Sequence, residues 1–142
     1  MTTSYLAHAI SAAVQGFGWA PSGVHAGANE SAKKDGERSE WQRIEALLSK
    51  WSQKQPLRDE DGVEWPSPAL VEVALNLARS LEGQALHPPS RVVPNGEGGV
   101  VFEFQREHQL QTMEVDADGS IELCRFEDSQ LVDRSRIRAT TD

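Results

Sequence analysis

Apolar and polar residues alternate along the stretch from Gly98 to Cys124, and a period of two is typical of β-strands. One alternating run precedes the polar pair Glu107-His108, a second run follows it, and a third follows a turn at Asp116 to Gly119. The pattern predicts an antiparallel meander with one apolar face, which other elements must cover. That face consists of the following residues: Val100, Phe102, Phe104, Met113, Val115, Ile121 and Leu123.

The turn from Asp116 to Gly119 sets the register between the second and third runs. A two-residue turn at Asp118-Gly119 would place Val115 opposite Glu122 and mix the two faces. A three-residue loop with a left-handed glycine instead pairs Val115 with Ile121. Asp at the first turn position and Gly at the last favour this loop. We therefore predict the bulged register.

A tight turn at Glu107-His108 pairs Phe102 with Met113 in the first hairpin. A further strand is predicted over Leu131 to Arg138, where arginines at alternating positions suit the edge of a sheet. Arg91 to Val93 predicts a short strand before the meander. The sheet is therefore expected to have three to five strands.

Apolar residues at helical spacing predict three helices before the strands. The first covers Thr3 to about Gln15, and the second covers about Ser39 to Gln53, with Ser39 opening a capping box. The third starts at Pro68 behind the N-cap Ser67 and ends just before Gly83. The apolar stripe of the first helix consists of Leu6, Ile10, Val14 and Phe17.

The segment between the first two helices is small, polar and glycine-rich without periodicity, which predicts a flexible linker. We therefore expect an N-terminal amphipathic helix over residues 1–19, a linker over residues 20–38 and a single α+β domain over residues 39–142. In that domain the helices precede an antiparallel meander, and the Pro68 helix packs on its apolar face. A length of 142 residues fits one domain of this kind.

The formal net charge of −8 argues against a general nucleic-acid binder, which needs a basic surface. A basic protein partner is one interpretation of this charge, and solubility is the interpretation that we favour. Cys124 is the single cysteine, which excludes an internal disulfide. The apolar run from Leu6 to Val14 is too short for a membrane span and lacks a basic flank. We therefore expect a cytoplasmic protein without a membrane partner.

Several motifs lie between Pro88 and Leu123: a Gly98-Gly99 pair before a strand that contains Phe104, then Met113-Glu114-Val115, then Gly119. They resemble those of a widespread group of small bacterial proteins of uncharacterised function. Members show a G-G-hydrophobic-x-L-E-W strand, an L-E-I strand and a D-G turn. Phe104 stands where that group usually has Trp. The resemblance covers about residues 59–123, implies a stand-alone or operon-partner protein, and supplies no catalytic residues.

The carboxylates Glu103, Glu114 and Glu122 are expected on the polar face of the sheet, with Glu114 directly opposite Glu122. Converging carboxylates can perform acid/base catalysis or bind a cation. An alternating row of glutamates on a solvated face is the interpretation that we favour. The four histidines are scattered without metal-ligand spacing, and nucleophile motifs are absent from the sequence. The sequence therefore predicts no cofactor and no metal site.

Two sets of apolar residues are candidates for binding a partner. Trp41 and Trp51 share the stripe of the second helix, for which core packing is the favoured interpretation and partner binding the alternative. A second set is expected on the otherwise polar sheet face, where it forms an interface or lies under the first helix. This set consists of Val101, Leu110, Phe126 and Leu131.

These features favour a small acidic protein-interaction module over an enzyme. We expect an accessory, antitoxin or immunity-type protein whose partner is a second protein, basic or encoded in the same operon, or another copy of the chain. This expectation rests on analogy and on charge. The alternative is a carboxylate-based enzyme or a cation-binding domain that uses the polar sheet face.

Overall fold

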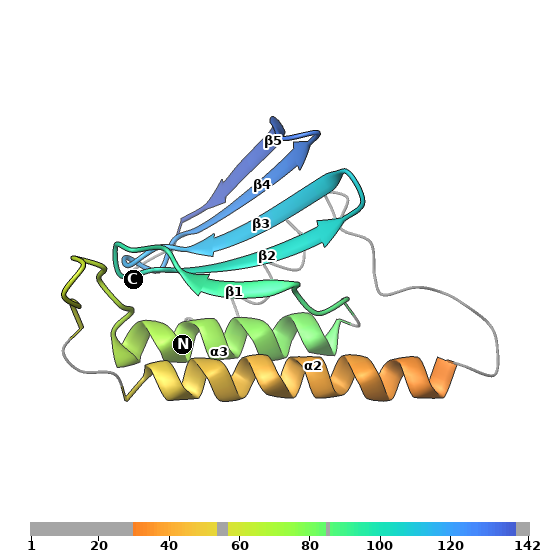
Figure 1. Cartoon of the computed structure of the whole chain (residues 1–142), viewed down its shortest axis with the longest axis horizontal. Helices are drawn as coiled ribbons and strands as arrows, with labels where there is room; N and C mark the ends of the chain where they lie inside the picture. The colour runs from red at the N-terminus through yellow and green to blue at the C-terminus, as the bar shows by residue number, and fades with distance from the viewer. Residues whose placement is uncertain (1–29, 54–56, 85, 139–142) are drawn as a thin grey trace.

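The computed structural model describes residues 30–53, 57–84 and 86–138. This part of the chain has an α+β fold, as the sequence predicts, with two helices and a five-stranded antiparallel sheet in the order β1-β2-β3-β4-β5. Helix α3 lies between α2 and the sheet, and β5 is the strand farthest from both helices (Figure 1). The elements are α2 (Glu30–Trp51), α3 (Pro68–Gly83), β1 (Arg91–Pro94), β2 (Val100–Arg106), β3 (Gln109–Val115), β4 (Ile121–Glu127) and β5 (Gln130–Ile137).

The predicted strand register is confirmed in both hairpins of the meander. Phe102 lies opposite Met113 across β2 and β3, and Val115 lies opposite Ile121 across β3 and β4. Gly119 has a φ of +88° and donates its N–H to the carbonyl of Asp116 at 2.8 Å, as the bulged turn requires. This register places the alternating apolar residues on one face of the sheet.

The apolar face of the sheet and the buried side of α3 belong to one hydrophobic core cluster, to which α2 also contributes. The exposed fraction of Phe102, Met113 and Leu123 is 0%. Helix α3 begins as predicted, because Ser67 Oγ accepts a hydrogen bond from the N–H of Leu70 at 3.2 Å and Pro68 follows it. Seven residues of α3 are buried: Leu70, Val71, Ala74, Leu75, Leu77, Ala78 and Leu81. Neither described helix combines the length and the apolar character that a membrane span requires.

The end of α3 differs slightly from the prediction. Gly83 is the last helical residue, and Gln84 caps the helix with a φ of −89° rather than a left-handed one. The N–H of Gln84 donates to the carbonyls of Ser80 and Leu81. The last turn therefore closes on its own backbone and does not need glycine in the left-handed region.

The predicted start of the second helix at Ser39 is wrong, since α2 begins at Glu30. Ser39 is inside the helix, where its Oγ donates a hydrogen bond back to the carbonyl of Asp35 at 3.0 Å. Residues 30–38, which the sequence assigned to a linker, are therefore helical. The segment contains Ala, Lys, Glu and Arg, which are strong helix formers, so a helix anchored at Trp41 extends toward its N-terminus despite Gly36. The predicted helix over Thr3 to Gln15 and residues 20–29 of the predicted linker lie outside the described residues.

The two tryptophans of α2 attach this helix to the rest of the core. Trp41 is 2% exposed and donates its Nε1–H to the carbonyl of Leu86 at 3.2 Å. The ring of Trp51 meets that of Trp65 edge to face, with the centroids 5.4 Å apart. Each indole therefore joins α2 to a segment that is distant in the sequence.

We expect Phe102→Ala to lower the free energy of unfolding by about 3–5 kcal/mol, because the ring is fully buried and its loss leaves a cavity. Val101→Ala, on the opposite face of the same strand, is half-buried and should cost only about 1 kcal/mol. Urea denaturation followed by circular dichroism measures both values. Equal losses in the two variants would contradict the assignment of faces.

Two glycine substitutions should change stability in opposite directions. A Cβ at Gly99 would lie 2.4 Å from Asn95 Nδ2 and 2.5 Å from the carbonyl oxygen of Val115, so Gly99→Ala should destabilise the protein by about 1–3 kcal/mol. Gly36 lies inside α2 with no atom within 4 Å of the added Cβ, and Gly36→Ala should stabilise it by about 0.5–1 kcal/mol. Thermal melting of both variants tests the pair. A lower melting temperature for Gly36→Ala would argue against the extended α2.

Candidate functional site

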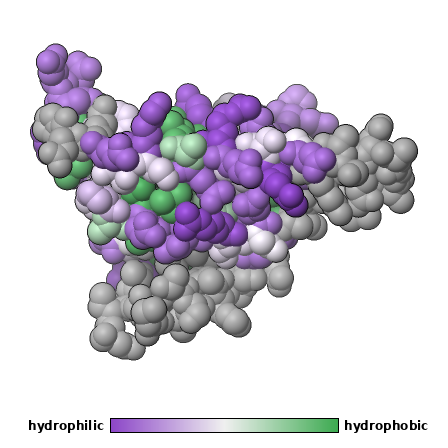
Figure 2. Space-filling model, turned by 90° about the horizontal axis from the view of Figure 1, so that it is seen from below, coloured by the Kyte–Doolittle hydropathy of each residue, from purple (hydrophilic) through white to green (hydrophobic). Residues whose placement is uncertain are grey.

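The outer face of the sheet, opposite the core, is where the sequence places its candidate site residues other than Trp41 and Trp51. Seen from the side on which α2 lies, the described surface is mostly hydrophilic, with smaller hydrophobic patches in it (Figure 2). The outer face contains two different regions. One consists of carboxylates and their partners, and the other is a row of apolar side chains near the turns that end β2 and β4.

Each of the three predicted carboxylates has its own hydrogen-bond donor. Glu103 accepts two hydrogen bonds from Arg91, from Nε and Nη2, both at 3.1 Å. Glu114 accepts one from Asn95 Nδ2 at 2.8 Å. Glu103 thus pairs with a residue of β1, and Glu114 pairs with a residue of the turn that follows β1.

Glu122 is held by two arginines of β5. Its Oε2 accepts a hydrogen bond from Arg134 Nη2 at 2.7 Å, and Arg136 Nη1 lies 3.6 Å from the same oxygen. The hydrogen bond and then the charge of Glu122 raise the pKa of Arg134. Glu114 lies directly opposite Glu122, as predicted. The two arginines of β5 offset the repulsion between these like charges.

The carboxylates do not form a metal centre in the part of the chain that the structure describes. No group of three or more His, Cys, Asp and Glu side chains is placed there to hold a metal ion. The described carboxylates of the outer face instead stabilise the sheet through cross-strand pairs.

The outer face also carries an apolar row, by which we mean Leu110, Phe126 and Leu131. These residues are direct neighbours across β3, β4 and β5. Leu131 is 49% exposed, and the adjacent Val132 is 47% exposed at an irregularity in the pairing of β4 with β5. The row is therefore an apolar strip that runs to the edge of the sheet.

Val101 does not belong to the apolar row, although the sequence grouped it there. It lies opposite Glu114, whereas Leu110 lies opposite Gln105, four residues farther along β2. The antiparallel register thus places Val101 among the carboxylates, toward the other end of the strands. Trp41 and Trp51 are 2% and 8% exposed and belong to the core, which fits the favoured interpretation of core packing.

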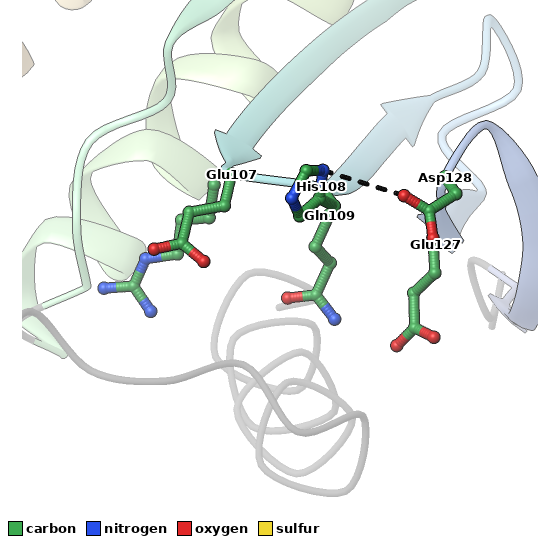
Figure 3. Close-up of a pocket in the computed structure, with 6 residues that line it drawn as sticks. Glu107, His108, Gln109, Glu127 and Asp128 are labelled. Carbon is green, nitrogen blue, oxygen red and sulfur yellow. Dashed lines mark ion pairs between the residues drawn. The ribbon is translucent and has the colours of Figure 1, made fainter.

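Two turns meet at the end of the sheet beside the apolar row. The N–H of Asp128 donates to the carbonyl of His108 at 3.0 Å, and His108 Nδ1 lies 3.7 Å from Asp128 Oδ1 (Figure 3). Glu107, Asp128 and Ser129 have positive φ values of 50°, 49° and 68°, a conformation that non-glycine residues rarely adopt. Neither turn contains glycine, so no residue type in the sequence indicates this conformation.

An open cavity of about 650 Å³ lies against these turns. The side chains of Gln109 and Glu127, which are opposite residues on β3 and β4, extend into it in the same direction (Figure 3). The side chains of His108 and Asp128 are both more than 80% exposed, so solvent weakens any attraction between them. Charges of both signs line the cavity, which does not favour one class of ligand. The lining residues are Arg106, Glu107, His108, Gln109, Glu127 and Asp128.

Sequence reasoning missed three groups of this face. Val132 was treated as an ordinary strand residue, and its exposure follows from the irregular pairing of β5. The role of Asn95 is not evident from the sequence: its side chain accepts the N–H of Gly99 at 2.7 Å and donates to Glu114. The sequence predicts a strand at Arg91 but does not indicate that its side chain pairs with Glu103. The adjacent pair Leu131-Val132 in an otherwise charged stretch is the one feature of the sequence that indicates an exposed apolar edge.

We expect the thiol of Cys124 to react slowly with iodoacetamide at about pH 8, because burial and then the charge of Glu122 raise its pKa. Glu122→Gln removes that charge and should accelerate the alkylation. Glu103→Gln is the matched control, since Glu103 pairs with Arg91 and should leave the rate unchanged. Mass spectrometry of the native protein over time measures the rates. The same acceleration in both variants would contradict the assigned cause.

The chain matches no known protein family, no curated protein sequence and no solved structure.

Proposed function

We propose that this protein is an interaction module, which binds another protein through the apolar row and the adjoining strand β5. The exposure of Leu131 at the edge end of the row, together with that of its neighbour Val132, is the observation that carries the proposal. Among the described residues, three large hydrophobic side chains are exposed, and two of them, Leu131 and Val132, are neighbours on β5. Apolar side chains that cluster at the surface are typical of binding sites.

The surroundings of the row also resemble a binding surface. Arg134 flanks it on β5 with a side chain that is 61% exposed, and arginine is frequent among residues that dominate binding energy. Glu122 holds the guanidinium in place, which lowers the entropy that is lost when a partner binds. A central apolar strip with a polar border is the usual arrangement of a protein interface.

In its specific form, we propose a cytoplasmic accessory, antitoxin or immunity-type protein. The support is the size of the chain and the presence of one organised apolar strip on its outer face. The arginines of β5 balance the nearby carboxylates, so this surface does not call for a basic partner. We therefore assign the net charge of −8 to solubility.

We do not propose the carboxylate-based enzyme or cation site. Glu103, Glu114 and Glu122 each accept hydrogen bonds from a neighbouring side chain. A catalytic pair or a cation site would need carboxylates that face a shared space. No observation on the described residues favours that alternative.

We expect Leu131→Arg to reduce the binding of the partner at least tenfold, or roughly 1.4 kcal/mol, because a charge replaces the exposed end of the apolar row. Leu57→Arg is the matched control, since Leu57 is also an exposed leucine (38%) but lies in the segment between the helices. Proteins from the native host that each tagged variant retains are quantified by mass spectrometry. The proposal predicts a protein that the wild type and Leu57→Arg retain and that Leu131→Arg loses.

Circular dichroism must first show that both leucine variants melt like the wild type. If all three proteins retain the same set at equal levels, the apolar row is not the binding surface. Loss of the same protein from both variants would also contradict the proposal.

A further inference from the structure

The two edges of the sheet differ in their capacity to pair with another strand. β1 at one edge has four residues and ends at Pro94, which has no N–H to donate. β5 at the other edge has eight residues, and no described strand pairs with its outer side. It also lies farthest from the helices (Figure 1). The structure thus leaves one long sheet edge uncovered by any described element.

Proteins usually protect such an edge with charged side chains or with a bulge. In β5 the charges are turned inward, because Arg134 pairs with Glu122 of β4 and Arg136 pairs with Asp116 of the β3–β4 turn at 3.1 Å. The pairing of β4 with β5 shifts near Val132, and it is regular from Asp133 to Ile137. Along this regular stretch the side chains of Arg134 and Arg136 are held over the sheet, and the N–H of Arg134 donates to Asp133 Oδ1 at 2.9 Å, a local hydrogen bond that an added strand would replace.

The charges of β5 argue against a second copy of the chain as the occupant. A symmetric antiparallel pair aligns the strand with itself about a central residue. Within the regular stretch from Asp133 to Ile137, a pair centred on Asp133, Arg134 or Arg136 places that charge opposite its own copy. A pair centred on Ser135 places Arg134 opposite Arg136, and one centred on Ile137 places Arg136 opposite Arg138. Like charges that face each other across two strands are destabilising. The edge therefore suits a strand of different sequence.

We propose that β5 accepts a sixth strand from the partner, an extended segment with carboxylates opposite Arg134 and Arg136 and an apolar residue opposite Leu131. This inference rests on the proposed function and defines its partner. Main-chain hydrogen bonds supply the affinity in strand addition, and alternate side chains supply the selectivity. Arg134 contacts Glu122 through Nη2, and a guanidinium has five N–H donors, so it can pair with a further carboxylate.

The apolar row belongs to the same binding mode. A strand added to β5 would continue the cross-strand neighbours Leu110, Phe126 and Leu131 by one more residue. An apolar side chain at that position would cover the exposed half of Leu131. The edge and the row therefore form one continuous site.

The test uses the full chain and a synthetic peptide of about ten residues in which one face carries a valine and two glutamates at alternating positions and the other face carries threonine. We expect saturable changes of the amide signals and slower hydrogen exchange over Asp133 to Ile137, measured by nuclear magnetic resonance. A peptide in which lysine replaces glutamate should bind at least tenfold more weakly. The double variant R134E/R136E should reverse this preference. The control R43E/R58E changes the same charge at exposed sites outside the sheet and should keep the preference of the wild type.

Three results would overturn strand addition at β5: no response to either peptide, equal binding of both peptides, or protection at β1 instead. Protection of β5 without peptide, together with concentration-dependent dimerisation in sedimentation, would assign the edge to a second copy. If the peptides fail while Leu131→Arg still loses its partner, the binding mode is wrong and the proposed function stands. If Leu131→Arg loses nothing, the proposed function fails as well.

Discussion

Phe102, Met113 and Leu123 lie opposite one another across β2, β3 and β4, and all three are fully buried. Each burial contributes about 1.5–3 kcal/mol relative to an exposed side chain. A slip of one residue in either hairpin would turn an entire strand over and expose its apolar set. The packing of this row into a core shared with α3 and α2 is therefore the constraint that fixes the sheet.

The same register determines what the outer face presents. With Met113 buried, Thr112 and Glu114 must point outward, and Leu110 must lie beside Phe126. The apolar row and the carboxylate pairs are thus consequences of the core and need no separate device to position them. This explains how a small sheet keeps exposed leucine and valine at one edge while its core stays closed.

The distribution of charge on the outer face of the sheet differs from what the net charge of the chain suggests. The chain has a net charge of −8, yet Glu103 and Glu122 on the outer face are paired with arginines from β1 and β5. These pairs hold neighbouring strands together and keep the arginines of β5 directed over the sheet. The total charge alone suggested a basic partner, whereas the local arrangement supports an acidic segment at β5.

The sequence by itself determined the strands, their register and the start of α3. Each of these depends on a few neighbouring residues: the alternation of apolar and polar residues, the turn from Asp116 to Gly119, and the pair Ser67-Pro68. The sequence misplaced the start of α2, since a packed helix extends through any segment whose residues tolerate it. Only the tertiary structure decided the partner of the Trp41 indole, the side-chain partner of each carboxylate and the exposure of Leu131. Those properties depend on residues that are 12 to 45 positions apart, and no local pattern encodes which distant segments meet.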